Sequence, residues 1–149
     1  MECMCQCLSA CAVEAIAACC PELATLGLNG SCDELVTDAV FPALARGCPA
    51  LANLDVQDTP GLTDDKIPGF RGFSNLVKLN VSDCSLTYEG WHAFAERLPR
   101  LRFVDISDCL SVTHNGLATL KHAYPEVLFC AEDSGLHREA ELWSDDDDG

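Results

Sequence analysis

Residues 76–90 read LVKLNVSDCSLTYEG, and residues 101–116 read LRFVDISDCLSVTHNG. The two stretches share one pattern, with an aliphatic residue at the first, fourth and sixth places and cysteine at the ninth. The last two aliphatic residues of each triplet alternate with other residues, as on one face of a short β-strand. The two stretches are therefore interpreted as copies of one structural unit.

The same unit recurs along most of the chain. Its starting points are Pro21, Pro49, Ser74, Pro99 and Pro125, which are separated by 28, 25, 25 and 26 residues. A nearly constant period of this length indicates a repeat architecture. The aliphatic triplets of the first four units are Leu23, Leu26 and Leu28; Leu51, Leu54 and Val56; Leu76, Leu79 and Val81; and Leu101, Val104 and Ile106.

A second set of repeated positions follows each predicted strand. A small side chain comes first, as Cys32, Thr59, Cys84 and Cys109. A threonine then stands where its side chain can accept backbone amide hydrogen bonds as a helix N-cap, at Thr37, Thr63, Thr87 and Thr113. Residues four and seven places later share one helical face, and these are Phe41 and Leu44, Ile67 and Phe70, Trp91 and Phe94, and Leu117 and Leu120.

The second of these helices is the weakest, because Pro68, Gly69 and Gly72 all disfavour a regular helix, and a loose turn is the alternative. No single unit can bury its own apolar face, so the units must stack. The predicted fold class is α/β: a solenoid of about four to five repeats, with a curved parallel sheet inside and helices outside.

At these residues the chain resembles the cysteine-containing subfamily of leucine-rich repeats, known from F-box/leucine-rich-repeat proteins and related to the ribonuclease-inhibitor-like solenoid. Cys20-Pro21 and Cys48-Pro49 match the opening of that repeat, and the resemblance covers residues 12–130. It implies a protein-binding solenoid. The chain departs from the pattern in having no F-box helices, in Thr59 and Ser74, and in a fifth unit that fades after Val127 and Cys130.

The two ends of the chain differ from its middle. Residues 12–20 are expected to form the helix of a truncated first repeat, whose strand would lie near Cys3 to Cys7. Either the chain is part of a longer protein or this repeat docks on a neighbouring subunit. Residues 132–149 end in four aspartates and are expected to be a disordered acidic tail, so the predicted domains are a solenoid at 1–131 and a tail at 132–149.

Composition restricts the partners and the compartment. Nine Lys and Arg face 24 Asp and Glu, and the net charge of −15 repels nucleic acid and anionic lipid. The odd number of cysteines, 11, favours reduced thiols. No secretion signal, transit peptide or apolar stretch long enough for a membrane helix is evident. A cytoplasmic or nuclear location is expected, and a cytoskeletal or ciliary assembly is compatible with it.

Candidate binding residues lie between the core leucines, where strand residues face the concave side of the sheet. The mixture of an aromatic residue with hydrogen-bonding groups is typical of binding hot spots and predicts a partner with a basic or amide-rich surface. The alternative is that these side chains are only solvated, with Asp58, Asp83 and Asp108 bonding their own turns. The predicted binding residues are Asn53, Asp55, Lys78, Asn80, Phe103 and Asp105, flanked by Asn29, Gln57, Ser82 and Ser107 and by a line of like charge at Asp58, Asp83 and Asp108.

Other chemistry has weaker support in the sequence. Cys3, Cys5, Cys7 and Cys11 could hold a metal or carry palmitate, but plain packing explains them better, and no cofactor is expected. The histidines (His92, His114, His122 and His137) share no nucleophile and no metal-ligand spacing. The chain is therefore predicted not to be an enzyme.

Three functions remain after these exclusions. The first is a scaffold or subunit of a larger protein assembly. The second, which follows from the F-box resemblance, is a substrate-recognition solenoid of a cullin-type ubiquitin ligase. The third is an enzyme regulator that covers an active site with its curved surface.

Overall fold

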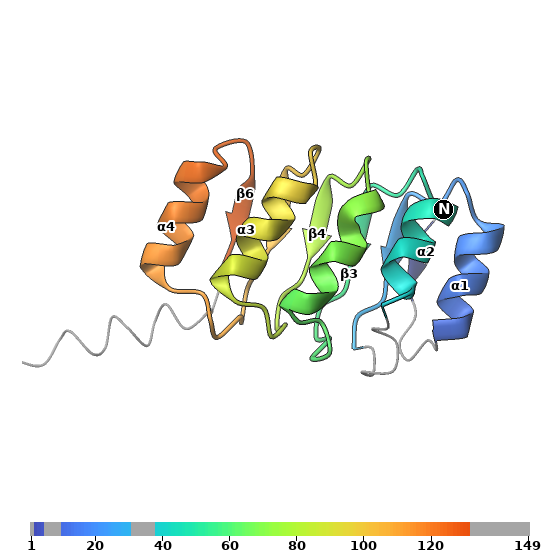
Figure 1. Cartoon of the computed structure of the whole chain (residues 1–149), viewed down its shortest axis with the longest axis horizontal. Coiled ribbons are helices and arrows are strands. Elements are labelled where there is room, and N and C mark those ends of the chain that lie inside the picture. The colour runs from blue at the N-terminus through green and yellow to red at the C-terminus, as the bar shows by residue number, and fades with distance from the viewer. Residues whose placement is uncertain (1, 5–9, 31–37, 132–149) are drawn as a thin grey trace, which may run out of the picture.

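The computed structural model of the chain describes residues 2–4, 10–30 and 38–131. Within these ranges six short parallel strands form one sheet in sequence order, and the units stack along the long axis of the molecule (Figure 1). Each strand is three residues long. The strands are β1 (Glu2–Met4), β2 (Thr25–Gly27), β3 (Asn53–Asp55), β4 (Lys78–Asn80), β5 (Phe103–Asp105) and β6 (Leu128–Cys130).

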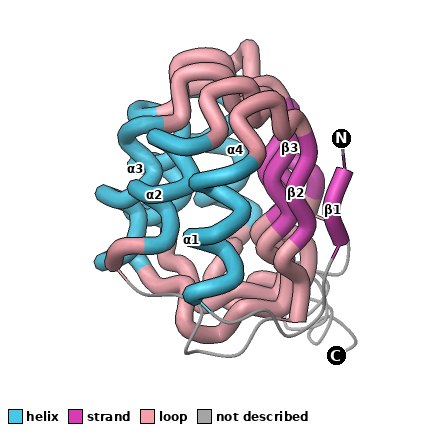
Figure 2. Tube along the Cα trace, turned by 90° about the vertical axis from the view of Figure 1, so that its right-hand side faces the viewer, coloured by secondary structure: helices cyan, strands magenta, loops and turns pink. Residues whose placement is uncertain are grey.

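A helix follows each of the first five strands. The view along the stack shows two layers, with helices on one side and strands on the other (Figure 2). The helices are α1 (Ala10–Cys19), α2 (Val40–Gly47), the 3-10 helix η2 (Asp64–Gly72), α3 (Tyr88–Arg97) and α4 (His114–Ala123). Among the described helices, none combines the length and the apolar character that crossing a membrane requires. The predicted α/β architecture with a parallel sheet is confirmed.

The strands pair without any shift in register. Leu26 lies opposite Leu54, Leu54 opposite Leu79, and Leu79 opposite Val104. All four side chains are buried on the helix side of the sheet, as their place in the triplets predicts. Beyond the strands the ladder continues, because Val56 N donates to Asn80 O at 2.9 Å and Val81 N to Asp105 O at 3.0 Å. Each unit is thus fixed to the next by both backbone and core.

The helical faces predicted from the threonine spacing are also confirmed. All eight residues are buried, from Phe41 and Leu44 in α2 to Leu117 and Leu120 in α4. Phe70 links three units, because its ring centroid lies 4.2 Å from that of Phe41 and 4.8 Å from that of Phe94. Aromatic contacts of this kind contribute stability beyond that from the burial of apolar area, and they hold neighbouring units together.

The second unit departs from a regular helix, as its prolines and glycines suggested. Residues 64–72 form a 3-10 helix with Pro68 inside it, and Pro68 has no amide hydrogen to donate. Gly72 is needed for close packing, because a Cβ atom there would lie 2.7 Å from the Cβ atom of Ala45. A narrow 3-10 segment therefore replaces an α-helix where two units approach closely.

The predicted capping is only partly correct. Thr113 accepts a hydrogen bond from Gly116 N at 3.1 Å. Thr63 and Thr87 hold the N-cap positions, but their hydroxyl groups donate to carboxylates instead, Thr63 to Asp65 and Thr87 to Asp64. The prediction is wrong for these two threonines because acidic residues at the starts of the helices compete for the hydroxyl. Thr37 lies outside the described residues.

Both ends of the sheet lie within the predicted solenoid. β6 continues the sheet past β5 and ends at Cys130, where the repeat pattern was expected to fade, and its middle residue Phe129 is buried. At the other end β1 begins at Glu2, and Cys3 pairs with Leu26. Cys5 and Cys7, Cys32 and the acidic residues 132–149 lie outside the described residues.

Candidate protein-binding face

The side of the sheet that faces away from the helices carries two columns of side chains, from the first and third residues of the strands. We call it the open face. The strand register lines up Thr25, Asn53, Lys78, Phe103 and Leu128 in one column and Gly27, Asp55, Asn80, Asp105 and Cys130 in the other. All six predicted binding residues lie in these columns. The sequence pattern missed Leu128 and Cys130, although Leu128 follows Phe103 by the same 25 residues that separate Lys78 from Phe103.

A hollow on the open face gathers five of the six predicted residues. It has a volume of about 180 Å³ and spans strands β2 to β5. A lysine, an aromatic ring, two amides and a carboxylate meet there, and Asp105 stays outside. The lining residues are Thr25, Asn53, Leu54, Asp55, Lys78, Leu79, Asn80 and Phe103.

Two apolar side chains mark one end of this hollow. Phe103, which is half-buried, lines it, and Leu128, which is 64% exposed, pairs in register with Phe103. Phe103 in turn lies opposite Lys78 of β4. Large apolar side chains beside hydrogen-bonding groups can anchor a partner, since burying them on binding is favourable.

The acidic and amide side chains of the second column also hold the turns that follow the strands. Oδ1 of Asp55 accepts from Gln57 N, and Oδ1 of Asp105 accepts from Ser107 N, each at 3.0 Å. Asn80 makes the same bond to Ser82 N and also accepts from the Ser82 hydroxyl at 2.7 Å. Ser82 is consequently buried rather than open to solvent, which corrects the prediction for that position. These bonds orient the side chains and leave the second oxygen of each carboxylate for other contacts.

The line of aspartates just past the strands has a backbone cause. Asp58, Asp83 and Asp108 have φ values of 53°, 55° and 56°, and Gly30 occupies the equivalent place with φ 65°. Aspartate tolerates this left-handed conformation better than most residues. Their amides extend the ladder, since Asp83 N donates to Ser107 O at 2.9 Å. The alternative that these three aspartates bond their own turns applies instead to the column of Asp55, Asn80 and Asp105.

The cysteine column behaves as a packing element. Cys84 donates its thiol to Val56 O and Cys109 to Val81 O, both at 3.4 Å, so each thiol bonds the previous unit. Burial raises the pKa of Cys84 to about 12 and that of Cys109 to about 11. Thr59 at the same position is buried and donates to Gln57 O. These protonated thiols are poor nucleophiles and poor metal ligands.

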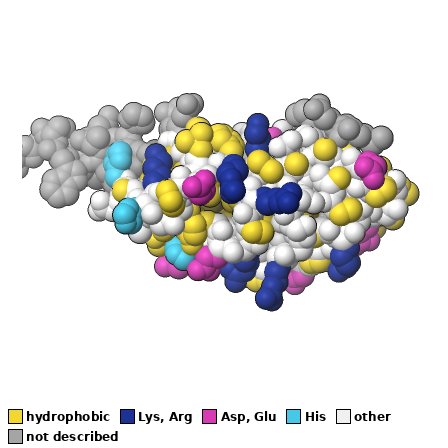
Figure 3. Space-filling model, turned by 90° about the horizontal axis from the view of Figure 1, so that it is seen from above, with side chains coloured by type: hydrophobic (Ala, Val, Ile, Leu, Met, Phe, Trp, Pro, Cys, Tyr) yellow, Lys and Arg dark blue, Asp and Glu magenta, His cyan; other side chains and the backbone are white. Residues whose placement is uncertain are grey.

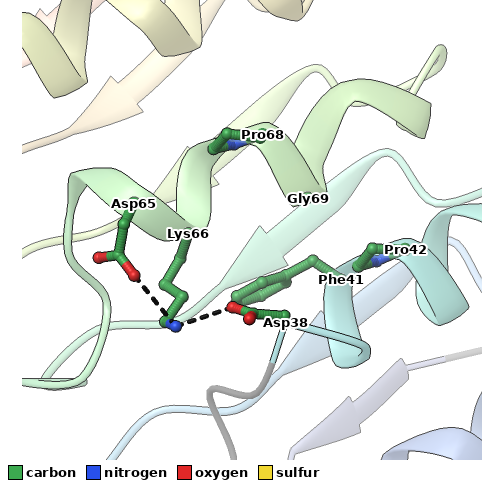
Figure 4. Close-up of a pocket in the computed structure, with 7 residues that line it drawn as sticks. All are labelled: Asp38, Phe41, Pro42, Asp65, Lys66, Pro68 and Gly69. Carbon is green, nitrogen blue, oxygen red and sulfur yellow. Dashed lines mark hydrogen bonds and ion pairs between the residues drawn. The ribbon is translucent and has the colours of Figure 1, made fainter.

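A second hollow, of about 290 Å³, lies on the helix side between α2 and η2 (Figure 4). Lys66 dominates it, because its Nζ contacts Asp38 at 2.8 Å and Asp65 at 3.1 Å. Hydrogen bonds to these carboxylates raise the pKa of Lys66 above its ordinary value. The walls are Phe41, Pro42, Pro68 and Gly69. The positive charge in this hollow is already matched by two carboxylates.

The histidines do not form a common site. His92 lies 3.1 Å from the Tyr124 hydroxyl and 3.5 Å from Glu96, on the helix side, while His114 and His122 are exposed on α4. In the described ranges no group of three or more His, Cys, Asp or Glu side chains could hold a metal ion. Cys11 is exposed on α1. The side chains of Cys3, Cys5 and Cys7, and the whole of His137, lie outside what the structure describes.

Comparisons with known proteins bear on the fold alone. No protein-family model and no curated protein sequence matches the chain. Among solved structures, a chain in the crystal structure of the Rad7 and Elc1 complex in yeast is similar, with a TM-score of 0.61 and 16% sequence identity. The similarity covers 87% of this chain and 40% of that one, so the chain spans well under half of its neighbour. The chain thus has a parallel-sheet α/β fold that also occurs in a protein complex.

Proposed function

We propose that the chain is a cysteine-containing leucine-rich-repeat protein without catalytic activity, whose open face binds another protein within a larger assembly. The observation that carries the proposal is the hollow at Lys78 and Phe103, where identical backbone register presents different side chains in successive strands. Such a surface distinguishes partners by side-chain chemistry, with the backbone serving as a rigid support.

The chemistry of the face favours a mixed partner surface. Asp55 and Asp105 keep one carboxylate oxygen beyond the turn bond and can pair with basic or amide groups. Phe103 and Leu128 offer an apolar anchor beside them. The partner that fits best presents an apolar side chain flanked by Lys, Arg, Asn or Gln.

A second candidate is the substrate-recognition solenoid of a cullin-type F-box ubiquitin ligase, or part of one. The resemblance of the repeats to F-box/leucine-rich-repeat proteins favours it. So does the similar fold of a chain in the Rad7 and Elc1 complex, of which this chain covers 40%. In both cases we propose a reducing compartment, cytoplasmic or nuclear, because the cysteines of the described residues are free thiols.

The test is affinity purification of the tagged full chain from cells, with quantification of the proteins that co-purify. Recovery of one large assembly at fixed stoichiometry supports the scaffold role. Recovery of a cullin and its adaptor supports the second candidate instead. Recovery of no protein above the level of an unrelated tagged control would contradict both.

Variants locate the binding face. Phe103→Ala is expected to weaken partner binding about tenfold or more, because a buried aromatic anchor contributes over about 1.4 kcal/mol. Leu110→Ala is the matched control, since Leu110 is 83% exposed but lies in the turn after β5 and not on the open face. Asp55→Asn with Asp105→Asn removes charge while keeping an oxygen for the turn bond. If Phe103→Ala and the double variant both bind normally, the open face is not the binding site.

A further inference from the structure

The edge of the solenoid where helices end and strands begin carries a cluster of positive charge. Five exposed side chains from the second, third and fourth units lie there, and we call them the basic edge: Arg71, Lys78, Arg97, Arg100 and Arg102. The view onto this edge shows several Lys and Arg side chains over its middle, with an acidic side chain among them (Figure 3). The cluster is unexpected in a chain with a net charge of −15.

The positive charges of the basic edge meet only neutral acceptors in the described part of the chain. Arg100 donates to Asn75 Oδ1 at 2.9 Å, Arg102 to Leu101 O at 2.9 Å, and Arg97 to Ala93 O at 3.2 Å. The ion pairs among described residues involve Lys66 and His92 and none of these five side chains.

Local structure accounts for only part of this arrangement. A cation near a helix C-terminus is stabilised by the helix dipole, which explains Arg71 and Arg97. Arg100 and Arg102 stand in the loop before β5, and Lys78 begins β4, so no helix end accounts for these three. Their proximity follows from the register, since Arg102 N donates to Val77 O next to Lys78.

The chain itself contains a segment of matching charge. Residues 132–149 hold eight acidic residues and one arginine, and four consecutive aspartates occupy 145–148. They begin one residue after the end of β6, the strand that pairs with β5. At about 3.3 Å per extended residue, even the eight residues 132–139 can span about 26 Å. A tethered segment also acts at an effective concentration of about millimolar, whereas a free acidic partner would meet the repulsion of the whole chain.

We propose that residues 139–149 bind the basic edge of the same molecule, with the carboxylates of Glu139, Glu141 and Asp145 to Asp148 against the guanidinium groups of Arg100 and Arg102. Lys78 belongs to both the basic edge and the hollow on the open face. The bound segment therefore borders the hollow, and a partner that uses Lys78 competes with it. The inference shares Lys78 with the proposed function, but it concerns a contact within one molecule and is tested without any partner.

A zero-length carbodiimide cross-linker tests the contact, because it joins a lysine amine only to a carboxylate that touches it. The chain has three lysines, Lys66, Lys78 and Lys121, which serve as internal comparators. We expect peptides that link Lys78 to Glu139 or Glu141 in the monomer, at several times the yield of links from Lys121, with a marked loss at about 1 M salt, where screening acts within about 3 Å.

Two variants and a control make the test decisive. Arg100→Glu with Arg102→Glu should reduce the Lys78 links several-fold. The control, Arg46→Glu with Lys121→Glu, makes the same change of charge in the last turns of α2 and α4, to either side of the cluster, and should reduce the links much less. Replacing Asp145 to Asp148 by Asn should give the same loss without touching the described fold. Equal links from Lys78 and Lys121, links insensitive to the first variant, or links between molecules in a mixture of light and ¹⁵N-labelled protein would each overturn the proposal.

Discussion

The two faces of the sheet follow different rules. On the helix side the middle residues of β2 to β6 are all apolar, and all are buried: Leu26, Leu54, Leu79, Val104 and Phe129. On the open face the neighbouring column holds Thr25, Asn53, Lys78, Phe103 and Leu128, in which polar, charged and aromatic residues share the same backbone geometry. The residue type is therefore kept from strand to strand where packing between units constrains it. It varies where the side chain faces away from the helices.

The largest expected effect tests the buried column. Leu79→Ala should lower the free energy of unfolding by about 2–5 kcal/mol, because Leu79 is fully buried and its truncation leaves a cavity. Lys78→Ala, one residue away on the open face, should change it by no more than about 0.5 kcal/mol. Urea unfolding of both variants measures the difference. Similar losses from both would remove the distinction between the faces.

The next effect concerns the turn where a strand leaves the sheet, a position constrained by backbone conformation. Asp83→Val should lower stability by about 1–3 kcal/mol, because a β-branched residue is strained at a φ of 55°. Asp83→Gly should be close to neutral, as Gly30 already occupies the equivalent position. Thermal unfolding of the pair checks this. A tolerated valine would mean that the aspartates are kept for their charge.

Alkaline pH should lower the free energy of unfolding through the buried thiols of Cys84 and Cys109. Burial raises the pKa values of Cys84 to about 12 and Cys109 to about 11. Because the unfolded chain ionises these thiols near their ordinary pKa, their contribution to stability is complete below that value and is lost as the pH rises from about 9 towards 12. Urea unfolding from pH 8 to 11 should show a decline that is smaller in a Cys84→Ala variant.

Thiol alkylation at pH 8 compares the reactivity of the exposed cysteines with that of the buried ones. Cys11 and Cys19 are exposed and should react quickly, whereas Cys84 and Cys109 should react only on unfolding. Mass spectrometry of partly alkylated protein measures each site. Rapid labelling of Cys109 in folded protein would show that the units open locally.

The smallest expected effect is on the charge of the open face. Asp105→Asn keeps an oxygen to accept from Ser107 N, as Asn80 does for Ser82, so stability should stay within about 0.5 kcal/mol. Asp105→Ala removes that acceptor and should lower stability by about 1 kcal/mol. Urea unfolding distinguishes the two. A large loss with asparagine would mean that the fold itself requires the carboxylate.

Most of the fold could be predicted because packing repeats. The triplets placed the buried strand residues, and the eight helix residues predicted from the threonine spacing are all buried. The fifth unit was expected from Pro125 to Cys130, but its strand residues were not assigned, because Glu126 and Leu128 interrupt the aliphatic pattern just before Phe129. The caps at Thr63 and Thr87 were mispredicted because Asp65 and Asp64 compete for their hydroxyl groups, and a motif does not reveal such competition.

The candidate site divides in the same way. The six residues predicted for the open face share columns with the expected alternation, and five of them line one hollow. Their part in binding remains a prediction. The second column's bonds to the turns and the basic edge were not foreseen, because they depend on which side chains meet once the units are stacked.

The sequence by itself determined the repeat, the parallel α/β architecture and the two faces of the strands, because a fixed period and the burial of aliphatic side chains are local properties of the chain. Only the tertiary structure decided which open-face residues form a hollow and that Arg71, Lys78, Arg97, Arg100 and Arg102 share one edge. The physical reason is that stacking places residues about 25 positions apart on adjacent strands, which lie about 4.8 Å from one another. The side chains that meet on the surface therefore come from different units.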